Sequence, residues 1–495
     1  MAGPAEPRRI AVVLAAGEGK RMRSALPKVL HEAAGRPLLA WVLDAARGAG
    51  CERLLVVVGH GAEAVRAAFP DLPASAWVLQ GEQRGTGDAL ARAEAAVADL
   101  APGGRATLLV LSGDVPLVSP RTLADLAGAV AGTPEDQRAA WGAMAVADLD
   151  EPGSLGRVVE GPGGSLARIV EARDASATEL AIRRVNAGLY ALPAPQIFDY
   201  LRRLAPDNAQ GELYLTDALS AAAADGHEIR LLPLADPAEA WGVNRRGELA
   251  LVHRRLIDRH LAALEAAGVT VLEPSRTIVE PGVEVGPDTV IHPSAALLGK
   301  SRIGRGCTLH QGTWLRDTAL GDGVTVHPYS VLDGAAIEDG AEVGPFARLR
   351  PAAHLLAGSR VGAFVEVKNA VLGAGAKVNH LAYVGDADVG AGANLGAGAI
   401  TCNFDGERKH RTEIGRAAFI GSDTILVAPV KVGDGATTAA GSVITRDVPA
   451  GALAVGRSRQ KNLPGRLGRR GRRTAQDPEP PAEPPPDGDP EQRPE

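Results

Sequence analysis

The sequence has few aromatic residues and few cysteines. Aromatic side chains make up 3% of the 495 residues, and the 3 cysteines, Cys51, Cys307 and Cys402, lie far apart. An odd number of scattered cysteines argues against a disulfide framework, and these three lack the paired spacing of a zinc site. This cysteine usage fits a reducing compartment.

The chain also lacks a large excess of charge of one sign, and it lacks long apolar runs. The formal net charge is −6 in a chain that is 45% hydrophobic, so no basic excess points to nucleic acid as a partner. No apolar run reaches the length of a membrane span, and residues 1–9 contain no apolar signal-peptide region. We therefore expect a cytoplasmic protein with no membrane span and no nucleic-acid partner.

What the chain does contain is 60 glycines and a repeat of six residues. Helices repeat every 3.6 residues and strands every 2, so a six-residue period indicates a parallel β-helix, in which one aliphatic residue per face points into a narrow core. The aliphatic series, with one-residue shifts before positions 320 and 337, is Val279, Val285, Ile291, Leu297, Ile303, Leu309, Leu315, Leu320, Val326, Leu332, Ile337, Val343, Leu349, Leu355, Val361 and Val367.

An alternative is a long antiparallel β-domain whose aliphatic residues fall in step by chance, but the unbroken series disfavours it. Glycine often follows the inward residue, at Gly286, Gly304, Gly344 and Gly362. We expect the chain to turn sharply at these positions.

The first half of the chain alternates short apolar runs with helical patterns. Strands are expected at 9–14, 53–58, 77–79 and 107–111, and helices at 38–49, 62–69 and 88–98, with another opening at 208–217. This alternation predicts a parallel sheet with helices on both faces. Ligands of such sheets bind beyond the carboxyl ends of the strands.

The chain length and these patterns predict five segments. They are a disordered N-terminus (1–9), an α/β domain (10–244), a helical linker (245–268), the β-helix (269–463) and a disordered tail (464–495). The tail contains GRLGRRGRR followed by an acidic proline-rich stretch that cannot bury a core. Its basic run either is simply solvated or contacts an anionic partner.

A glycine-rich loop with basic residues follows the first strand, where a phosphate site would lie. Gly17 and Gly19 allow a close backbone approach, and Arg21 and Lys28 supply positive charge. The loop lacks the GK[ST] of a P-loop, and Met22 stands where G-x-G-x-x-G has its third glycine. Taken alone, the loop is therefore as consistent with a tight turn as with a phosphate site.

The surrounding motifs resemble those of sugar-1-phosphate nucleotidyltransferases. LAAGEGKRM with LPKVL is followed by QRGTG at 83–87, SGD at 112–114, Gly156-Arg157, and GVN at 242–244. In this order they resemble the uridyltransferase half of the bacterial bifunctional family of N-acetylglucosamine-1-phosphate uridyltransferase and glucosamine-1-phosphate acetyltransferase. The resemblance implies a modified Rossmann-like sheet and transfer of UMP from UTP to a sugar phosphate.

The resemblance also implies roles for individual residues. Asp114 and Asn244 would bind Mg²⁺. Arg21 and Lys28 would hold the triphosphate of UTP; Gln80, Gly85 and Thr86 would contact uracil; and Gly156, Glu171 and Asn186 would contact the acetylated sugar. The remaining nucleotide contacts would come from Leu14, Ala15, Ala16 and Gly17.

The repeats of the second half resemble the acetyltransferase half of the same family, which implies a left-handed β-helix. His380, in NHLAYVG, would be the general base that takes a proton from the attacking amine. Arg350 and Lys368 are eighteen residues apart, one full turn of a three-faced helix, so we expect them to stack and hold the phosphate of glucosamine-1-phosphate. Tyr383 and Asn394 would bind the same substrate, and Glu366 would support the site.

Acetyl-CoA would contact a further set of residues: Ala397, Asn403, Phe404, Ser422, Ala440 and Arg457. The aliphatic series is interrupted at FDGERKHRTE, which is too polar for the core and is expected to project outward. In the family this loop reaches a neighbouring subunit and the site forms between the members of a trimer, so the resemblance implies a homotrimer.

Four positions depart from the family pattern. Lys20 stands where the family has Thr, Asp88 where it has His, Arg245 where it has a second Asn, and Phe404 where it has Tyr. None of them removes a proposed metal ligand. Lys20 adds charge near the triphosphate, Asp88 would alter a base contact, and Phe404 removes a hydroxyl.

The leading hypothesis is a bifunctional enzyme that acetylates glucosamine-1-phosphate with acetyl-CoA and then transfers UMP from UTP to N-acetylglucosamine-1-phosphate. One alternative is a monofunctional nucleotidyltransferase whose β-helix only forms oligomers. Another is a non-catalytic regulatory subunit, like certain translation-factor exchange subunits. Retention of His380 and Lys368 disfavours the first, and retention of Asp114 and Asn244 disfavours the second.

Overall fold

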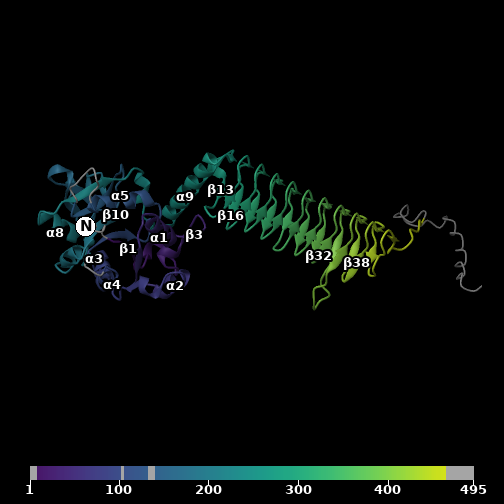
Figure 1. The fold of residues 1–495 in the computed structure, drawn as a ribbon, viewed down its shortest axis with the longest axis horizontal. Helices are drawn as coiled ribbons and strands as arrows, with labels where there is room; N and C mark the ends of the chain where they lie inside the picture. The colour runs from purple at the N-terminus through teal and green to yellow at the C-terminus, as the bar shows by residue number, and fades with distance from the viewer. Residues whose placement is uncertain (1–7, 102–104, 132–139, 464–495) are drawn as a thin grey trace, which may run out of the picture.

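The computed structural model describes residues 8–101, 105–131 and 140–463 as an α/β domain followed by a long β-helix. Figure 1 shows the α/β domain at one end and a prism of stacked short strands extending away from it, with α9 (Arg246–Ala266) between them. The expected tail at 464–495 lies outside the described residues, as do residues 1–7. None of the helices described is both long enough and apolar enough to cross a membrane.

One sheet organises the α/β domain, with the strand order β11-β7-β10-β6-β1-β4-β5. Strands β1, β4, β5 and β6 pair in parallel, as expected. The bounds are β1 (Arg8–Ala15), β4 (Arg53–Val58), β5 (Trp77–Leu79), β6 (Ala106–Ser112), β7 (Gly142–Asp148), β8 (Arg157–Glu160), β9 (Leu166–Val170), β10 (Arg184–Ala194) and β11 (Ile229–Pro233).

Two expectations about this sheet are corrected by the structure. Strand β10 pairs antiparallel with both β6 and β7, so the sheet is mixed. The chain travels from β7 to β10 through the β8–β9 hairpin instead of a crossover helix, which removes the requirement for parallel pairing. In addition, β1 begins at Arg8, so Arg8 and Arg9 form part of a strand and not of a disordered terminus.

Helices cover both faces of the sheet, because successive residues of a strand point to opposite sides. Ile10 and Val12 pack on one face, whereas Ala11 and Val13 pack on the other. The helices are α1 (Leu38–Gly48), α2 (Ala62–Ala68), α3 (Thr86–Ala91), α4 (Glu94–Leu100), α5 (Pro120–Ala131), α6 (Ala177–Leu180), α7 (Gln196–Leu201) and α8 (Leu215–Ala224). The helix predicted at 88–98 is thus two helices, and α8 begins only after the polar 208–214 segment.

The β-helix consists of three parallel sheets of 11, 10 and 9 strands. They run from β12 (Thr270–Val271) to β41 (Leu453–Ala454), from β13 (Ile278–Val279) to β40 (Val443–Ile444), and from β14 (Glu284–Val285) to β38 (Val430–Val432). Every residue of the predicted aliphatic series is buried except Val285, which is half-buried near the first turn. The six-residue period therefore predicted this core correctly.

At most of the glycines that follow inward residues, the backbone of the adjacent turn of the β-helix lies too close for a side chain. A sharp turn of the chain explains fewer of them. A Cβ on Gly304 would lie 2.4 Å from the Gly321 carbonyl oxygen, and one on Gly362 would lie 2.0 Å from that of Asn379. Of the four predicted glycines only Gly344, with φ +102°, has the left-handed backbone of a sharp turn. The next turn of the helix thus leaves no room for a side chain at these sites.

Helix α9 joins the two parts through a shared core. Its buried face, which includes Leu256, Ile257 and Leu261, belongs to one continuous apolar cluster. That cluster also contains Met22 of the α/β domain and Val279 of the first β-helix turns. The segment predicted as a helical linker is therefore a packed junction.

Val326 and Val285 provide a matched test of the core. The Val326 side chain is fully buried, so Val326→Ala should lower the free energy of unfolding by about 1–3 kcal/mol through lost burial and a residual cavity. Val285→Ala, at a half-buried position, should cost about 0.5 kcal/mol. Urea unfolding followed by circular dichroism measures both, and equal losses would contradict the assigned core.

Candidate active sites

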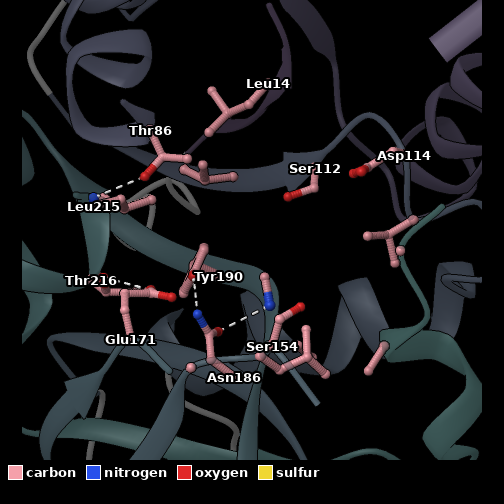
Figure 2. A pocket seen from close by; sticks show the side chains of 18 of the residues that line it. Leu14, Thr86, Ser112, Asp114, Ser154, Glu171, Asn186, Tyr190, Leu215 and Thr216 are labelled. Atoms are coloured by element: carbon pink, nitrogen blue, oxygen red, sulfur yellow. Dashed lines mark hydrogen bonds between the residues drawn. The ribbon is translucent and has the colours of Figure 1, made fainter. Parts of the chain in front are cut away.

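The first candidate site is a cleft at the carboxyl ends of β1 and β6, as the sheet architecture predicts. Two cavities, of about 220 and 320 Å³, share Leu14, Thr86, Ser112 and Asp114 and so are compartments of one cleft. Figure 2 shows the first compartment, with Ser112 and Asp114 above and Glu171, Asn186 and Tyr190 below. The second compartment is lined by Ala15, Ala16, Gly17, Lys28, Gln80 and Gly85, among others.

Charged and amide groups from three distant segments converge at the centre of this cleft. The Lys28 ammonium forms a salt bridge with Asp114 and donates to Asn244 Oδ1 at 3.2 Å. Arg21 Nη2 donates to the same Asn244 oxygen at 3.0 Å. The structure therefore brings together all four residues that the sequence assigned to metal and triphosphate binding.

The Asp114 and Asn244 oxygens fit a magnesium site. Mg²⁺ needs few protein oxygens, because it retains waters and binds substrate phosphates. One carboxylate and one amide oxygen already converge on a single cation, the Lys28 ammonium, which shows that both can face the same positive centre. No cluster of three or more histidine, cysteine or acidic side chains suitable for a metal occurs within the described ranges, so an all-protein cage is not available there.

The end of the cleft that the sequence assigned to uracil is organised around Gln80. This side chain is buried, and its Nε2 donates to Asp88 Oδ2 at 2.8 Å and to the Gly85 carbonyl at 3.2 Å. With both amide protons engaged, the Gln80 Oε1 atom remains as an acceptor. Asp88 therefore orients Gln80. The sequence analysis noted that Asp88 departs from the family pattern, but it did not predict this hydrogen bond to Gln80.

Gly85 and Thr86 are held in place by Leu213, just before α8, and by Leu215, the first residue of α8. Gly85 has φ +105°, and a Cβ there would lie 2.5 Å from the Leu213 carbonyl oxygen, so only glycine fits. Thr86 Oγ1 accepts a hydrogen bond of 3.1 Å from the Leu215 backbone N–H. These contacts fix the entrance to α3 beside the cleft.

The opposite end of the cleft contains Gly156, Glu171 and Asn186. Asn186 Nδ2 donates to the Tyr190 hydroxyl at 2.7 Å, while its Oδ1 accepts from the Gly188 backbone N–H at 3.0 Å (Figure 2). Burial raises the pKa of the Glu171 carboxyl, and a 3.1 Å hydrogen bond from Thr216 partly opposes this. Polar groups are thus fixed in a pocket able to take the hydroxyls and amide of a sugar.

The second candidate site lies on the β-helix, where successive turns place distant residues side by side. Leu349 of β25 (Arg348–Leu349) pairs with Val367 of β28 (Glu366–Lys368), so the next residues, Arg350 and Lys368, stack as predicted. Arg350 Nη1 also forms a 3.0 Å salt bridge with Glu366. Glu366 in turn pairs in register with Tyr383 of β31 (Tyr383–Gly385).

Lys409 joins this group although the sequence did not identify it. It comes from the excursion between β34 (Ile400–Cys402) and β35 (Thr412–Ile414), and the loop stands out from the prism in Figure 1 as expected. Phe404 and Lys409 form an antiparallel backbone β-bridge within this loop. The adjacent Lys368 ammonium lowers the pKa of Lys409, so two cations approach each other as they would around a phosphate.

Asp386 anchors the same region. Burial raises its pKa, but hydrogen bonds from the Asn369 and Asn403 amides outweigh this effect, so the pKa of Asp386 is lowered overall. Asn403 Nδ2 also lies 3.4 Å from the Tyr383 hydroxyl. A buried carboxylate therefore fixes Asn403 directly and Tyr383 through Asn403, and both of these residues were assigned to substrates.

His380 ends β30 (Lys377–His380), and its imidazole is exposed at a corner of the prism. No partner in the described part of the chain forms a hydrogen bond with this ring. Asn394 of β33 (Asn394–Leu395) lies one turn further along, in register with Lys377. An exposed imidazole at this position is accessible to a substrate amine.

Four of the residues assigned to acetyl-CoA follow the same corner over successive turns, whereas Asn403 and Phe404 lie at the start of the loop after β34. The Gly398 N–H donates to the His380 carbonyl at 3.4 Å, which places Ala397 one turn below His380. A Cβ on Gly396 would lie 2.6 Å from the Ser422 nitrogen, and one on Gly421 would lie 2.7 Å from the Ala440 nitrogen. Arg457 lies next to Gly441, so these residues form a line that an extended ligand could follow.

Two family models match the chain, one over its N-terminal part and one over a short part of the β-helix. Residues 11–280 match the model of the MobA-like NTP transferase domain, and residues 411–446 match the bacterial transferase hexapeptide model of six repeats. The expected fold class, a Rossmann-like nucleotidyltransferase domain followed by a left-handed parallel β-helix of hexapeptide repeats, is thereby confirmed.

Curated relatives match almost the whole chain. Proteins named "Bifunctional protein GlmU" from Pelobacter propionicus and Alkalilimnicola ehrlichii are 43% and 47% identical to it. Each alignment covers 92% of this chain, and 97% and 95% of the respective relative. A third protein of that name, from Geobacter metallireducens, is 45% identical over 475 residues. With these matches along both assembled sites, the chain belongs to the GlmU family of bifunctional proteins.

Proposed function

We propose that this chain acetylates glucosamine-1-phosphate with acetyl-CoA and then transfers UMP from UTP to the resulting N-acetylglucosamine-1-phosphate. The observation that carries the proposal is that one member of the GlmU family retains two separately assembled sites. One is the convergence of Arg21, Lys28, Asp114 and Asn244, and the other is the stack of Arg350 and Lys368 on the β-helix. A monofunctional nucleotidyltransferase would leave the site on the β-helix without a role, and a non-catalytic subunit would leave both sites without one.

Uridyl transfer relies on positioning and on neutralising charge. The sugar phosphate oxygen attacks the α-phosphorus of UTP, and the bond to the bridging oxygen of the leaving pyrophosphate breaks. Arg21 and Lys28 offset the negative charge of both reactants, while Gln80 and Asn186 orient the base and the sugar. Asp114 and Asn244 would hold Mg²⁺, which when bound would neutralise charge on the phosphates.

Acetyl transfer needs a base near an amine and a cradle for its phosphate. Arg350, Lys368 and Lys409 surround the phosphate, which leaves the sugar amine to face His380. The amine nitrogen attacks the thioester carbonyl carbon, the C–S bond breaks and CoA leaves as a thiolate. The His380 imidazole takes the amine proton and returns it to the CoA sulfur, so the base is regenerated.

We further propose that the protein forms a homotrimer and acts in the cytoplasm. Tyr329, Phe346, Phe364 and Leu381 form an apolar ridge along one corner of the β-helix, each of them exposed at between 48% and 64%. The aromatic rings of the ridge stack at 5.5 and 5.3 Å between centroids. An exposed patch of this kind marks an interaction surface. The ridge ends beside His380, so a second copy packed on it would reach the acetyltransferase site.

Asp114→Asn should reduce uridyl transfer about 10²-fold or more, because the charge at the metal site is lost. Chelation of divalent metal with EDTA should abolish the same activity. Pyrophosphate release from UTP and N-acetylglucosamine-1-phosphate measures both effects. Asp125→Asn, on the exposed face of α5, is the matched control. An Asp114→Asn enzyme of wild-type rate would disprove the metal assignment.

His380→Ala should lower acetyl transfer about 10²–10⁴-fold through loss of the general base, with uridyl transfer unchanged. Release of CoA in the presence of glucosamine-1-phosphate measures the effect. His354→Ala provides the control, since this histidine lies on another face and pairs with Glu338 at 3.1 Å. If the His380→Ala and His354→Ala variants had equal rates of acetyl transfer, His380 would not be the general base.

The double change Phe346→Asn and Phe364→Asn should dissociate the trimer and reduce acetyl transfer, while uridyl transfer persists. Asparagine tolerates the left-handed backbone of both positions, where φ is +57°, so folding is preserved. Analytical ultracentrifugation gives the oligomeric state. Leu251→Asn, at an exposed site on α9, is the control. A variant that remains trimeric would exclude the ridge as the interface.

A further inference from the structure

The two residues assigned to the metal lie on segments that are distant in sequence. Asp114 lies just after β6, and its carbonyl accepts a hydrogen bond of 2.9 Å from the N–H of Val243, the residue before Asn244. From Asp114 the chain continues through residues 115–119 to α5, and it reaches Asn244 through residues 236–243. We call these two stretches the flanking segments. The distance between them sets the spacing of the two metal ligands.

A single side chain of α9 connects the two flanking segments. Arg259 Nη1 donates to the Leu117 carbonyl at 2.6 Å, and Arg259 Nη2 donates to Asp236 Oδ2 at 3.2 Å. Burial raises the pKa of the Asp236 carboxyl, but hydrogen bonds from the Ala238 N–H and from Arg259 outweigh this effect and lower the pKa overall. Because a guanidinium is planar and its N–H groups point in fixed directions, Arg259 holds its two acceptors at a defined separation.

Glu239 connects the same two segments a second time. Its side chain is buried, and its Oε2 atom accepts a hydrogen bond of 3.0 Å from the N–H of Ser119, the residue before α5. A hydrogen bond to a charged acceptor is stronger than one between neutral groups. Arg259 therefore joins the flanking segments from α9, and Glu239 joins them from within the segment that leads to Asn244.

Helix α9 is a firm support for Arg259, because the flanking segments pack with it in one apolar cluster. Leu117 and Ala238 belong to the cluster that also contains Leu256 of α9 and Val279 of the β-helix, and all four side chains are buried. Arg259 itself lines a pocket that shares no lining residue with either compartment of the cleft. It can therefore act on the metal site only through the flanking segments.

We propose that Arg259 and Glu239 are positioning residues that set the spacing of Asp114 and Asn244 and so determine how tightly the site binds Mg²⁺. This inference rests on the proposed function. Mg²⁺ requires nearly ideal octahedral geometry, so a small shift of one ligand relative to the other lowers its affinity. Loss of a group that orients metal ligands typically weakens metal binding about 10–100-fold.

Arg259→Gln tests the proposal in the full-length protein, with Arg255→Gln as the matched control. Both arginines contact Asp236 from α9, Arg255 at 3.4 Å, whereas Arg259 also donates to the Leu117 carbonyl. In a titration with Mn²⁺ alone, followed by electron paramagnetic resonance, the Kd should rise about tenfold in Arg259→Gln and stay within about twofold of wild type in Arg255→Gln.

The Mg²⁺ dependence of uridyl transfer distinguishes positioning from a general loss of stability. In Arg259→Gln the Mg²⁺ concentration that gives half the maximal rate should rise about tenfold. The kcat at saturating Mg²⁺ and the KM for N-acetylglucosamine-1-phosphate should remain those of the wild type. A variant that is merely less stable would lose rate at every Mg²⁺ concentration.

Glu239→Ala and Glu239→Gln provide a second test that leaves α9 unaltered. Alanine removes the acceptor of the Ser119 N–H, whereas the side-chain carbonyl oxygen of glutamine can still accept this hydrogen bond. Glu239→Ala should therefore raise the Kd for Mn²⁺ about tenfold, and Glu239→Gln should bind Mn²⁺ as the wild type does. If Arg259→Gln did not fold, this pair of variants would decide.

Three outcomes distinguish this inference from the proposed function. An unchanged Kd for Mn²⁺ in Arg259→Gln or Glu239→Ala, or an equal rise in their controls, would overturn the positioning role and leave uridyl transfer standing. A raised Kd in a protein whose wild type does not turn over UTP would refute the uridyltransferase proposal and leave the positioning role standing. A wild-type protein that binds no Mn²⁺ would overturn both.

Discussion

The stacking of short strands around a buried aliphatic column is the constraint on which the C-terminal half depends. Neighbouring strands lie about 4.8 Å apart, and each turn of the β-helix returns the chain to the same corner. Residues about eighteen positions apart thus become neighbours, as Arg350 and Lys368 do. The same geometry forbids a Cβ at Gly362, where the backbone of the next turn lies 2.0 Å from it.

The two sites meet their electrostatic requirements in different ways. In the α/β domain, Lys28 and Asp114 come from separate segments of the chain and form a salt bridge. On the β-helix, the neighbouring Lys368 side chain lowers the pKa of Lys409. Under the proposed function, the first site would take a metal and phosphates together, and the second would take an anion between two cations.

Much of this arrangement was predictable because it depends on local periodicity. The aliphatic series locates inward residues such as Leu332, and the spacing of Arg350 and Lys368 fixes their contact. The direction of β10 was not predictable, since a strand buried on both faces has the same pattern whether it runs parallel or antiparallel. Lys409 was missed because its position depends on how a polar loop folds back, which no periodicity encodes. The role of Asp88 also required its contact with Gln80 to be seen.

The central claim is that one chain performs both transfers in sequence. The most direct test is to incubate the wild-type protein with glucosamine-1-phosphate, acetyl-CoA, UTP and Mg²⁺, and to quantify the nucleotide sugar by chromatography. The account predicts UDP-N-acetylglucosamine, formed only when acetyl-CoA is present, with CoA and pyrophosphate released in equal amounts. Nucleotide sugar that forms from added N-acetylglucosamine-1-phosphate but never from glucosamine-1-phosphate would contradict it.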